Sequence, residues 1–288
     1  MNGPDIRSPL LRALVYGHVW LGAGAFAQVW LTCHLVPLHA ERWPAAIAAG
    51  LATVSAYGFM RLAGMPDGIA SSEHLAWVHR HRQGMRVLVV LCGAVSAALL
   101  LPLAREAWWV ALLLGPAIAL YIVPFGAGEQ SGLRHIPFVK VFLIALVWSG
   151  VVVVFPFAAH ADENSPLLVY LGLERSCFVL AITLPFDVRD MHVDDAAHRT
   201  VPQMIGGRAT KVLAIVLLML SLTIVALICM TQGLFGELVG AFAAYICTAV
   251  LVLRSDPSRS TIHYNLLLDG TLVLVPAFIA LGMSLPIP

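Results

Sequence analysis

Three aspartates at helical spacing mark the part of this sequence that is best suited to chemistry. Asp187, Asp190 and Asp194 directly follow a long apolar stretch, in a protein in which only 11% of the residues are charged. On a helix, positions i, i+3 and i+7 share one face, and carboxylates gathered there repel one another unless a cation lies among them. Oxygen ligands suit Mg²⁺, which usually combines one or two carboxylates with substrate phosphates and water. The segment therefore predicts a magnesium–pyrophosphate site, with pairing to Arg189 and Arg199 at a solvated helix end as the alternative.

The composition indicates the environment that surrounds this segment. Apolar residues make up 60% of the chain and its mean hydropathy is +0.87, whereas soluble domains are about 45–50% apolar. Stretches long enough to cross a hydrocarbon core of about 30 Å recur throughout, without the alternation that barrel strands need. We predict nine transmembrane helices, at about 13–36, 43–64, 85–104, 107–125, 137–159, 166–186, 212–231, 234–253 and 264–285. The chain is thus expected to form one all-α integral membrane domain over residues 1–288.

The distribution of positive charge predicts the orientation of the chain. Most of the 17 Lys and Arg residues fall on one side if nine spans alternate across the membrane. By the positive-inside rule, the N-terminus lies in the cytoplasm and the C-terminus outside, and we expect the membrane to be the inner (plasma) membrane of a bacterium. A net charge of +1, with no basic patch interleaved with aromatic residues, predicts no nucleic-acid partner. Neither protein partners nor an oligomeric state follow from the sequence.

Ionisable residues concentrate in three connections on the predicted cytoplasmic side. These connections cover residues 61–86, 126–140 and 187–211, whereas those on the other side are short and nearly uncharged. A polar cap of this kind over an apolar helical bundle suits a substrate with a charged head and an apolar tail.

The aspartate-rich segment resembles a motif of a known family. Between Asp187 and Asp194 the chain reads D-V-R-D-M-H-V-D, followed by T-V-P and I-G. This is similar to the second aspartate-rich motif, D-x-x-D-x-x-x-D, of the UbiA superfamily of intramembrane prenyltransferases. The predicted span count, and the stretch from Leu133 to Lys140 before the fifth span, look like that family too.

The resemblance implies both a fold and a reaction. It implies a UbiA-like bundle of nine helices around a central cavity that opens to the cytoplasm, in which Mg²⁺ joins aspartates to an isoprenyl diphosphate. The prenyl group would be transferred to an aromatic or other lipid-soluble acceptor within the membrane. Carried over to this sequence, the catalytic and metal-binding residues would be Asp187, Asp190 and Asp194. The cationic residues expected to contact the diphosphate are Arg61, Arg134, Lys140 and Arg189.

One motif of that family is missing from this chain. The superfamily carries a first aspartate-rich motif, N-x-x-x-D-x-x-x-D, at the cytoplasmic end of the second span. The equivalent stretch here, residues 55–67, supplies only Asp67 and places Arg61 in the metal-binding region. Three explanations are open: Arg61 contacts diphosphate directly, Asp67 or Glu73 returns to the site, or the reaction has been lost. In the last case, a catalytically degenerate protein would bind an isoprenoid or quinone-like lipid, or scaffold a membrane complex.

Other polar residues lie inside predicted spans. Asn265 and Asp269 are four residues apart on one helix face, and we expect them to close the roof of the cavity. Glu174 and Arg175 lie in the middle of a span, where an ionisable residue is a candidate for function. As sequence neighbours they do not face each other on a helix, so each is expected to need a partner elsewhere. Such residues favour a transporter in principle, but no paired Gly/Pro-broken spans accompany them.

Five histidines are predicted not to act as ligands. His18 and His34, in the first predicted span, are expected to be interior histidines with satisfied hydrogen bonds. His74, His79 and His81 lie among arginines, which favours a basic juxtamembrane loop over a metal site.

Overall fold

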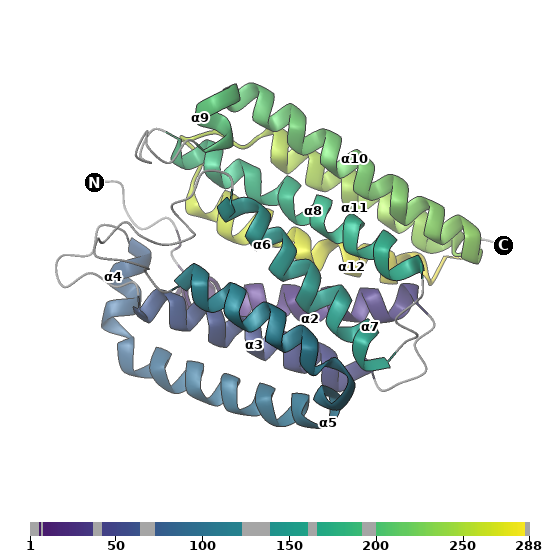
Figure 1. Cartoon of the computed structure of the whole chain (residues 1–288). Helices are drawn as coiled ribbons and strands as arrows, with labels where there is room; N and C mark the ends of the chain where they lie inside the picture. Colours follow the sequence, from purple (N-terminus) through teal and green to yellow (C-terminus); the bar gives the residue numbers. More distant parts are fainter. Residues whose placement is uncertain are drawn as a thin grey trace.

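The computed structural model describes residue 6 and residues 8–36, 42–63, 73–122, 139–160, 166–191 and 200–285. Within these ranges every regular element is helical and no strand occurs, as the composition predicts (Figure 1). Two of the elements, η2 and η4, are π-helical. The elements are, in chain order, α1 (Pro9–Tyr16), α2 (Val19–Leu35), α3 (Arg42–Ala63), α4 (Glu73–Arg80), α5 (Arg82–Ile122), α6 (Val139–Ser149), η2 (Gly150–Val154), α7 (Phe155–His160), α8 (Pro166–Asp190), α9 (Val201–Ile205), α10 (Gly207–Gln232), α11 (Phe235–Leu253), η4 (Ile262–Leu268) and α12 (Thr271–Gly282).

Among the described residues, seven helical segments are long and apolar enough to cross a membrane. They are Trp43–Ala63, Arg82–Pro102, Val139–Ala158, Pro166–Asp190, Gly207–Gln232, Phe235–Leu253 and Ile262–Gly282. Helices α1 and α2 are bent by 60° relative to each other and together form an eighth candidate. Segments of this length and hydropathy indicate an integral membrane protein. The predicted count of nine spans is not confirmed.

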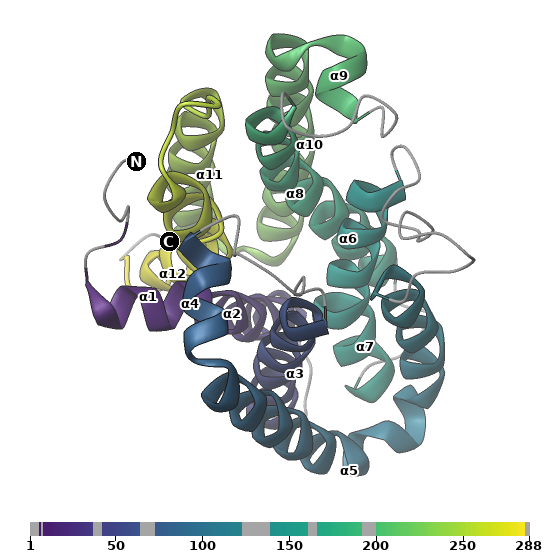
Figure 2. The same cartoon turned by 90° about the vertical axis from the view of Figure 1, so that its left-hand side faces the viewer.

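The difference in the count arises at α5. Residues 85–104 and 107–125 are predicted to be two spans separated by a short charged turn, but the structure continues as one helix, Arg82–Ile122, with Pro102 and Pro116 inside it. A proline removes one backbone hydrogen bond and bends a helix, yet a long apolar helix tolerates it when its neighbours compensate. Figure 2 shows α5 curving around the outside of the bundle along its course. Its second part contributes only a shorter apolar segment, Ala107–Pro116.

The helices pack into a closed ring. Following the contacts around it, α2 packs against α3, α3 against α5, α5 against α6, α6 against α8, α8 against α10, α10 against α11, α11 against α12, and α12 against α2. Figure 2 views this arrangement from one end of the bundle. Most of the buried apolar side chains form one cluster inside the ring, which includes Leu31, Trp148, Phe178, Tyr245 and Leu272. The ring therefore positions side chains from distant parts of the sequence around a common interior.

Close backbone approach holds α11 against α12. A Cβ atom built on Gly240 would lie 2.1 Å from the carbonyl oxygen of Phe278, and one built on Gly236 would lie 2.2 Å from that of Gly282. Both distances are shorter than any real Cβ contact, so glycine at these two positions is a steric requirement. Small residues spaced four apart allow helices in membranes to approach in this way.

The short helices α4 and α9 lie at the same end of the bundle (Figure 1). Helix α8 also ends here, at Asp190, and α9, the next helix in the chain, packs against α8. The described parts of the first and third of these polar connections, which include α4 and α9, therefore lie at the same end. Placement of this end in the cytoplasm stays a prediction.

Candidate functional site

A cavity of about 290 Å³ collects the predicted site residues at this end of the bundle. Every predicted site residue within the described part of the chain lines it: Arg61, Lys140, Asp187, Arg189, Asp190, Asn265 and Asp269. Arg134 and Asp194, the two others, lie outside the described residues, as does Asp67. These side chains come from α3, α6, α8, η4 and the segment joining η4 to α12, so the tertiary fold is what brings them together. Whether they bind a diphosphate stays a prediction.

Asp187 is the most buried carboxylate of the cavity. Its residue is only 3% exposed, and its Oδ1 lies 3.3 Å from Nζ of Lys140 on α6. A buried carboxylate is costly unless a cation or several hydrogen-bond donors compensate it. The Lys140 ammonium group, which is partly exposed, provides such a cation and ties α6 to α8.

Asp190 is held by its sequence neighbour. The Nε and Nη2 atoms of Arg189 donate to the two carboxylate oxygens of Asp190 at 2.7 and 2.8 Å. The Arg189 guanidinium also lies 5.3 Å from the ring centroid of Phe186 and 5.0 Å from that of Tyr264. Bidentate pairing and stacking on aromatic faces are the two interactions for which Arg is best suited, and together they position this cation at the cavity wall.

Of the predicted roof residues, Asn265 lies in the π-helical element η4 and Asp269 directly follows it. The backbone N–H of Asp269 donates to the carbonyl of Tyr264, five residues earlier, and both Asn265 and Asp269 line the cavity. The Oδ1 atom of Asn265 is buried and has no hydrogen-bond partner among the described residues. π-Helical turns are rare and often occur at functional sites. A buried acceptor without a donor is also costly in a folded protein, so a ligand donor or a water molecule is the expected partner.

Two histidines that were not predicted to be part of the site also line the cavity. His18 lies at the break between α1 and α2, and His74 lies in the first turn of α4. The prediction that His18 has satisfied hydrogen bonds is wrong for its Nε2 atom, which is buried without a partner among the described residues. The sequence contains one signal for this site, the Gly17-His18 pair that interrupts an apolar stretch. Nothing local connects it to His74, 56 positions later.

The His74 imidazole is neutral at pH 7. Burial and the positive charge of Arg61 lower the pKa of His74 to about 4. Its Nε2 lies 3.3 Å from the carbonyl oxygen of Tyr16, so this nitrogen carries the proton and donates it to the carbonyl. The ring also stacks on that of Tyr16, with centroids 4.6 Å apart. His74 is therefore held firmly between α1 and the cavity.

Glu73 does not replace the missing first motif in this structure. Its carboxylate lies 3.4 Å from Arg12 of α1, and it is not among the residues that line the cavity. Within the described residues, no group of three or more His, Cys, Asp and Glu side chains is arranged to hold a metal ion. Any metal here would therefore depend on Asp187 and Asp190, on residues outside the described ranges, and on oxygens from the substrate.

An apolar chamber of about 140 Å³ adjoins the polar cavity. It lies between α3 and the α6–η2 segment and is lined by Ala52, Thr53, Ala56, Tyr57, Met60, Leu143, Ile144, Val147, Trp148 and Val151. Tyr57, Ile144 and Trp148 line both spaces. At this junction, the indole N–H of Trp148 donates to the Tyr57 hydroxyl at 3.0 Å. The two spaces together could accommodate one molecule with a polar and an apolar end.

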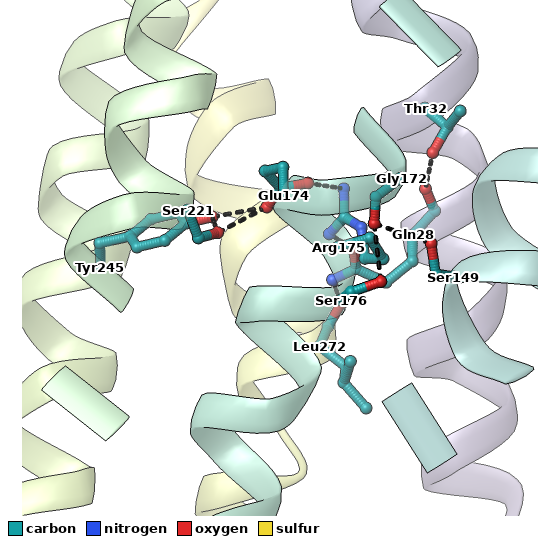
Figure 3. Close-up of polar contacts among 10 residues, drawn as sticks. All are labelled: Gln28, Thr32, Ser149, Gly172, Glu174, Arg175, Ser176, Ser221, Tyr245 and Leu272. Carbon is teal, nitrogen blue, oxygen red and sulfur yellow. Dashed lines mark hydrogen bonds and ion pairs between the residues drawn. The ribbon is translucent and has the colours of Figure 1, made fainter. Parts of the chain in front are cut away.

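A separate polar network is buried in the middle of the bundle (Figure 3). Glu174 and Arg175 are fully buried, and Oε1 of Glu174 accepts hydrogen bonds from Ser221 and Tyr245, both at 2.8 Å. Arg175 donates to Gln28 of α2. The expected partners on other helices are therefore present.

The expectation that Glu174 and Arg175 do not face each other is wrong. Nη2 of Arg175 lies 3.1 Å from Oε2 of Glu174. Both side chains are long enough to curl around the helix, and in a dry interior the attraction between opposite charges favours that conformation. This pair does not line either cavity, so the network ties α2, α8, α10 and α11 together rather than forming part of the candidate site.

Fold and cavity define an all-helical membrane protein with a polar site at one end of its bundle and an apolar chamber beside it. Two solved structures share this architecture. A UbiA homolog from Aeropyrum pernix K1, in its apo form, matches with a TM-score of 0.61 and 15% identity, over 92% of this chain and 96% of that one. A UbiA homolog from Archaeoglobus fulgidus matches with a TM-score of 0.60 and 14% identity, over 96% of this chain and 100% of that one.

These likenesses establish the UbiA-like fold that the aspartate-rich segment indicates. At identities this low, they concern the fold alone. No protein-family model matches the chain, and a sequence search of curated proteins finds no match either. The chemistry must therefore be argued from the site.

Proposed function

We propose that this chain is a divergent UbiA-type prenyltransferase, which transfers a prenyl group from an isoprenyl diphosphate to an aromatic or other lipid-soluble acceptor in the membrane. One observation carries the proposal: Asp187, Asp190, Lys140, Arg189 and Arg61 line a single cavity that adjoins an apolar chamber. Carboxylates and cations suit a metal-bound diphosphate, and the chamber suits a hydrocarbon chain. The UbiA-like fold supports the same assignment.

The shapes of the two spaces match an amphiphilic substrate. The diphosphate would lie in the larger cavity, where Arg61, Lys140 and Arg189 offer positive charge from three different helices. The prenyl chain would extend past Tyr57 and Trp148 into the apolar chamber. Apolar walls there would keep water away from the allylic cation that develops as the C–O bond breaks.

Asp187 and Asp190 are suitable ligands for one Mg²⁺ ion. They lie about one helical turn apart near the end of α8, line the same cavity, and offer the hard oxygen donors that this ion prefers. Mg²⁺ bound there would neutralise the diphosphate leaving group. Asp194, the third predicted ligand, belongs to the same proposal but lies outside the described residues.

The cations of the cavity have distinct proposed roles. Lys140 would exchange its contact with Asp187 for a phosphate oxygen when the carboxylate turns to the metal. Arg189, fixed between Phe186 and Tyr264, would hold the diphosphate in one orientation. Asn265, whose Oδ1 lacks a donor among the described residues, would accept a hydrogen bond from the substrates or from a bound water.

A second candidate function is favoured by the ion pairs in the cavity. Asp187 contacts Lys140 and Asp190 contacts Arg189, so both carboxylates have cationic partners without a metal. A protein that kept the fold after losing the reaction would show such pairs. It would bind an isoprenoid or quinone-like lipid, or act as a scaffold in a membrane complex.

Diphosphate binding distinguishes the two functions. Farnesyl diphosphate would be titrated into the purified protein in detergent, with Mg²⁺ or with EDTA, for the wild type and for Asp190→Ala. Asp256→Ala is the matched control, because Asp256 is an exposed acid outside the cavity. Mg²⁺-dependent binding that is lost in Asp190→Ala and kept in Asp256→Ala supports the transferase. Binding of farnesol or a quinone without any diphosphate preference supports the degenerate protein.

The cavity end is proposed to face the cytoplasm of a bacterial cell, on the basis of the positive-inside rule. Ser258 is exposed in the segment between α11 and η4, on the side predicted to be cytoplasmic. In intact cells, Ser258→Cys should therefore react with a membrane-impermeant maleimide only after the membrane has been opened. Labelling of intact cells would reverse the orientation.

A further inference from the structure

One wall of the cavity is basic and aromatic rather than acidic. It is formed by the α1–α2 break, α3 and α4, and it contributes His18, Tyr57, Arg61 and His74. The wall formed by α6 and α8 contributes the aspartates and their cationic partners. In the UbiA-type pattern, the first aspartate-rich motif would place carboxylates on the α3 side of the cavity. This chain has the Arg61 guanidinium there instead.

The backbone holds His18 in an uncommon conformation. Its φ angle is 59°, and it is the only residue other than glycine with a positive φ in the described part of the chain. A left-handed conformation is costly for a residue with a Cβ atom and is retained where the surrounding structure requires it. His18 is also only 5% exposed. The 60° bend between α1 and α2 thus places a buried imidazole at the cavity wall.

The Nε2 atom of His18 is available for a ligand. It is buried and has no hydrogen-bond partner among the described residues. Its ring lies near two other rings of the same wall, with centroid distances of 5.5 Å to His74 and 5.7 Å to Tyr57. Nearly all buried polar atoms in proteins are paired. An unpaired imidazole nitrogen that lines a cavity therefore indicates a ligand atom that is able to pair with it.

Charge in the cavity indicates which kind of ligand this wall favours. The described charged groups that line it are the cations Arg61, Lys140 and Arg189 and the carboxylates Asp187, Asp190 and Asp269. These formal charges cancel, but the cations and carboxylates are unevenly distributed. The α1–α4 wall carries Arg61 and two imidazoles with no carboxylate, so a negatively charged group is the favoured neighbour there. A phosphate has several acceptor oxygens, which the Arg61 guanidinium and an N–H of His18 are able to share.

We propose that His18, together with Arg61, binds one phosphate group of the ligand directly and without a metal ion. This inference rests on the proposed function in so far as the phosphate belongs to an isoprenyl diphosphate. The α1–α4 wall would then hold one phosphate and the α8 aspartates the other. Phosphate chemistry is shared with lipid headgroups, so the experiment must also distinguish these two sources.

The experiment compares His18→Asn with wild type in the full-length purified protein. Asn is the replacement of choice because it tolerates the left-handed conformation while it removes the imidazole. His81→Asn is the matched control, since His81 is exposed, does not line the cavity, and contacts the carbonyl and the ring of Trp77. Farnesyl diphosphate, inorganic pyrophosphate and phosphatidylglycerol in nanodiscs serve as probes, each with Mg²⁺ and with EDTA. Circular dichroism and the thermal midpoint verify that each variant is folded.

The expected result is a loss of diphosphate affinity by about tenfold or more in His18→Asn, the size expected for a hydrogen bond to a charged group. The loss should persist in EDTA, and His81→Asn should bind like the wild type. If His18→Asn binds both diphosphates with wild-type affinity while Asp190→Ala does not, this inference is wrong and the proposed function stands. If phosphatidylglycerol alone depends on His18, the phosphate contact stands and the transferase proposal fails. If the wild type binds none of the probes, both proposals fail.

Discussion

Lys140 on α6 reaches Asp187 on α8 with an Nζ to Oδ1 distance of 3.3 Å. The carboxylate side chain is only 4% exposed, whereas the lysine side chain is 37% exposed. The carboxylate is therefore the more buried partner of the pair, and both residues line the cavity. This relationship connects a residue of the aspartate-rich segment with a residue of the preceding polar connection, which is consistent with the diphosphate site that we propose between them.

Replacing Lys140 by Met should weaken diphosphate binding. The substitution keeps most of the side-chain volume but removes a cation from the cavity, so we expect the affinity for farnesyl diphosphate to fall about tenfold. Calorimetric titration measures this change. Lys211→Met is the control, because Lys211 contacts the Leu253 and Ser255 carbonyls away from the cavity. Equal effects of the two substitutions would contradict a specific role for Lys140.

The double variant Lys140→Met with Asp187→Asn tests the purpose of the ion pair. Lys140→Met leaves the buried Asp187 carboxylate without this cation and should lower the thermal midpoint. If Asp187 serves only to pair with Lys140, the double variant should regain the wild-type midpoint and bind farnesyl diphosphate as Lys140→Met does. If Asp187 also binds Mg²⁺, the double variant should lose the Mg²⁺ dependence of binding that Lys140→Met retains. Titrations with Mg²⁺ and with EDTA separate these outcomes.

Filling the apolar chamber should select against long prenyl chains. Ala52 lines this chamber, and Ala52→Leu adds three carbon atoms to a space of about 140 Å³. We expect the affinity for farnesyl diphosphate to fall several-fold while that for inorganic pyrophosphate stays unchanged, since only the former needs the chamber. Ala97→Leu, at an exposed position of α5, should alter neither. An equal loss of affinity for farnesyl diphosphate and pyrophosphate would show that the prenyl group does not bind in this chamber.

His74 should make the stability of the fold depend on pH. The pKa of this histidine is lowered to about 4 by burial and by Arg61, whereas in the unfolded chain it is about 6.5. Between pH 4 and pH 6.5 the unfolded state binds more protons than the folded state, so the free energy of unfolding rises with pH in this range. The contribution of His74 to stability is therefore complete above pH 6.5 and is lost as the pH falls toward 4. From pH 7 to pH 5, we expect a loss on the order of 1–2 kcal/mol.

Thermal unfolding in detergent at pH 7, 6 and 5 measures this effect. The wild type should lose more stability than His74→Asn over this interval, because the variant lacks the titrating group. The exposed His81 provides the control, since His81→Asn should follow the wild type at each pH. A wild type and a His74→Asn variant with parallel pH profiles would exclude a buried neutral imidazole.

The buried network of Figure 3 should be a major source of stability. Glu174→Ala removes the carboxylate that lies beside Arg175, and breaking a buried ion pair on one side typically costs about 3–5 kcal/mol. Tyr245→Phe removes one hydrogen-bond donor to Glu174 and the contact of that hydroxyl with Ser221, and should cost about 1–2 kcal/mol. Thermal midpoints of the two variants give the comparison. A small effect of Glu174→Ala, no larger than that of Tyr245→Phe, would show that Arg175 finds other partners.

Much of the fold class follows from local properties of the sequence. The apolar stretches, their length and the lack of strand alternation predict a helical membrane protein, and the structure agrees with this class. The spacing of Asp187 and Asp190 likewise places both on one helix end, because three residues are close to one turn. Local reasoning fails at α5, where a short charged stretch between two apolar ones does not end the helix.

The tertiary structure alone decides which side chains meet. His18 and His74 line the same cavity as Arg61, Lys140 and Asp187. The family resemblance predicts that the last three share a site, but nothing in the local sequence around either histidine relates it to them. Their meeting depends on how α2, α3, α6 and α8 pack in the ring. Helical periodicity and hydropathy are set by neighbouring residues, whereas the contacts of a side chain depend on helices far away in the sequence. The aspartate-rich segment was therefore visible in the sequence, and the two histidines that line the same cavity became visible only in the fold.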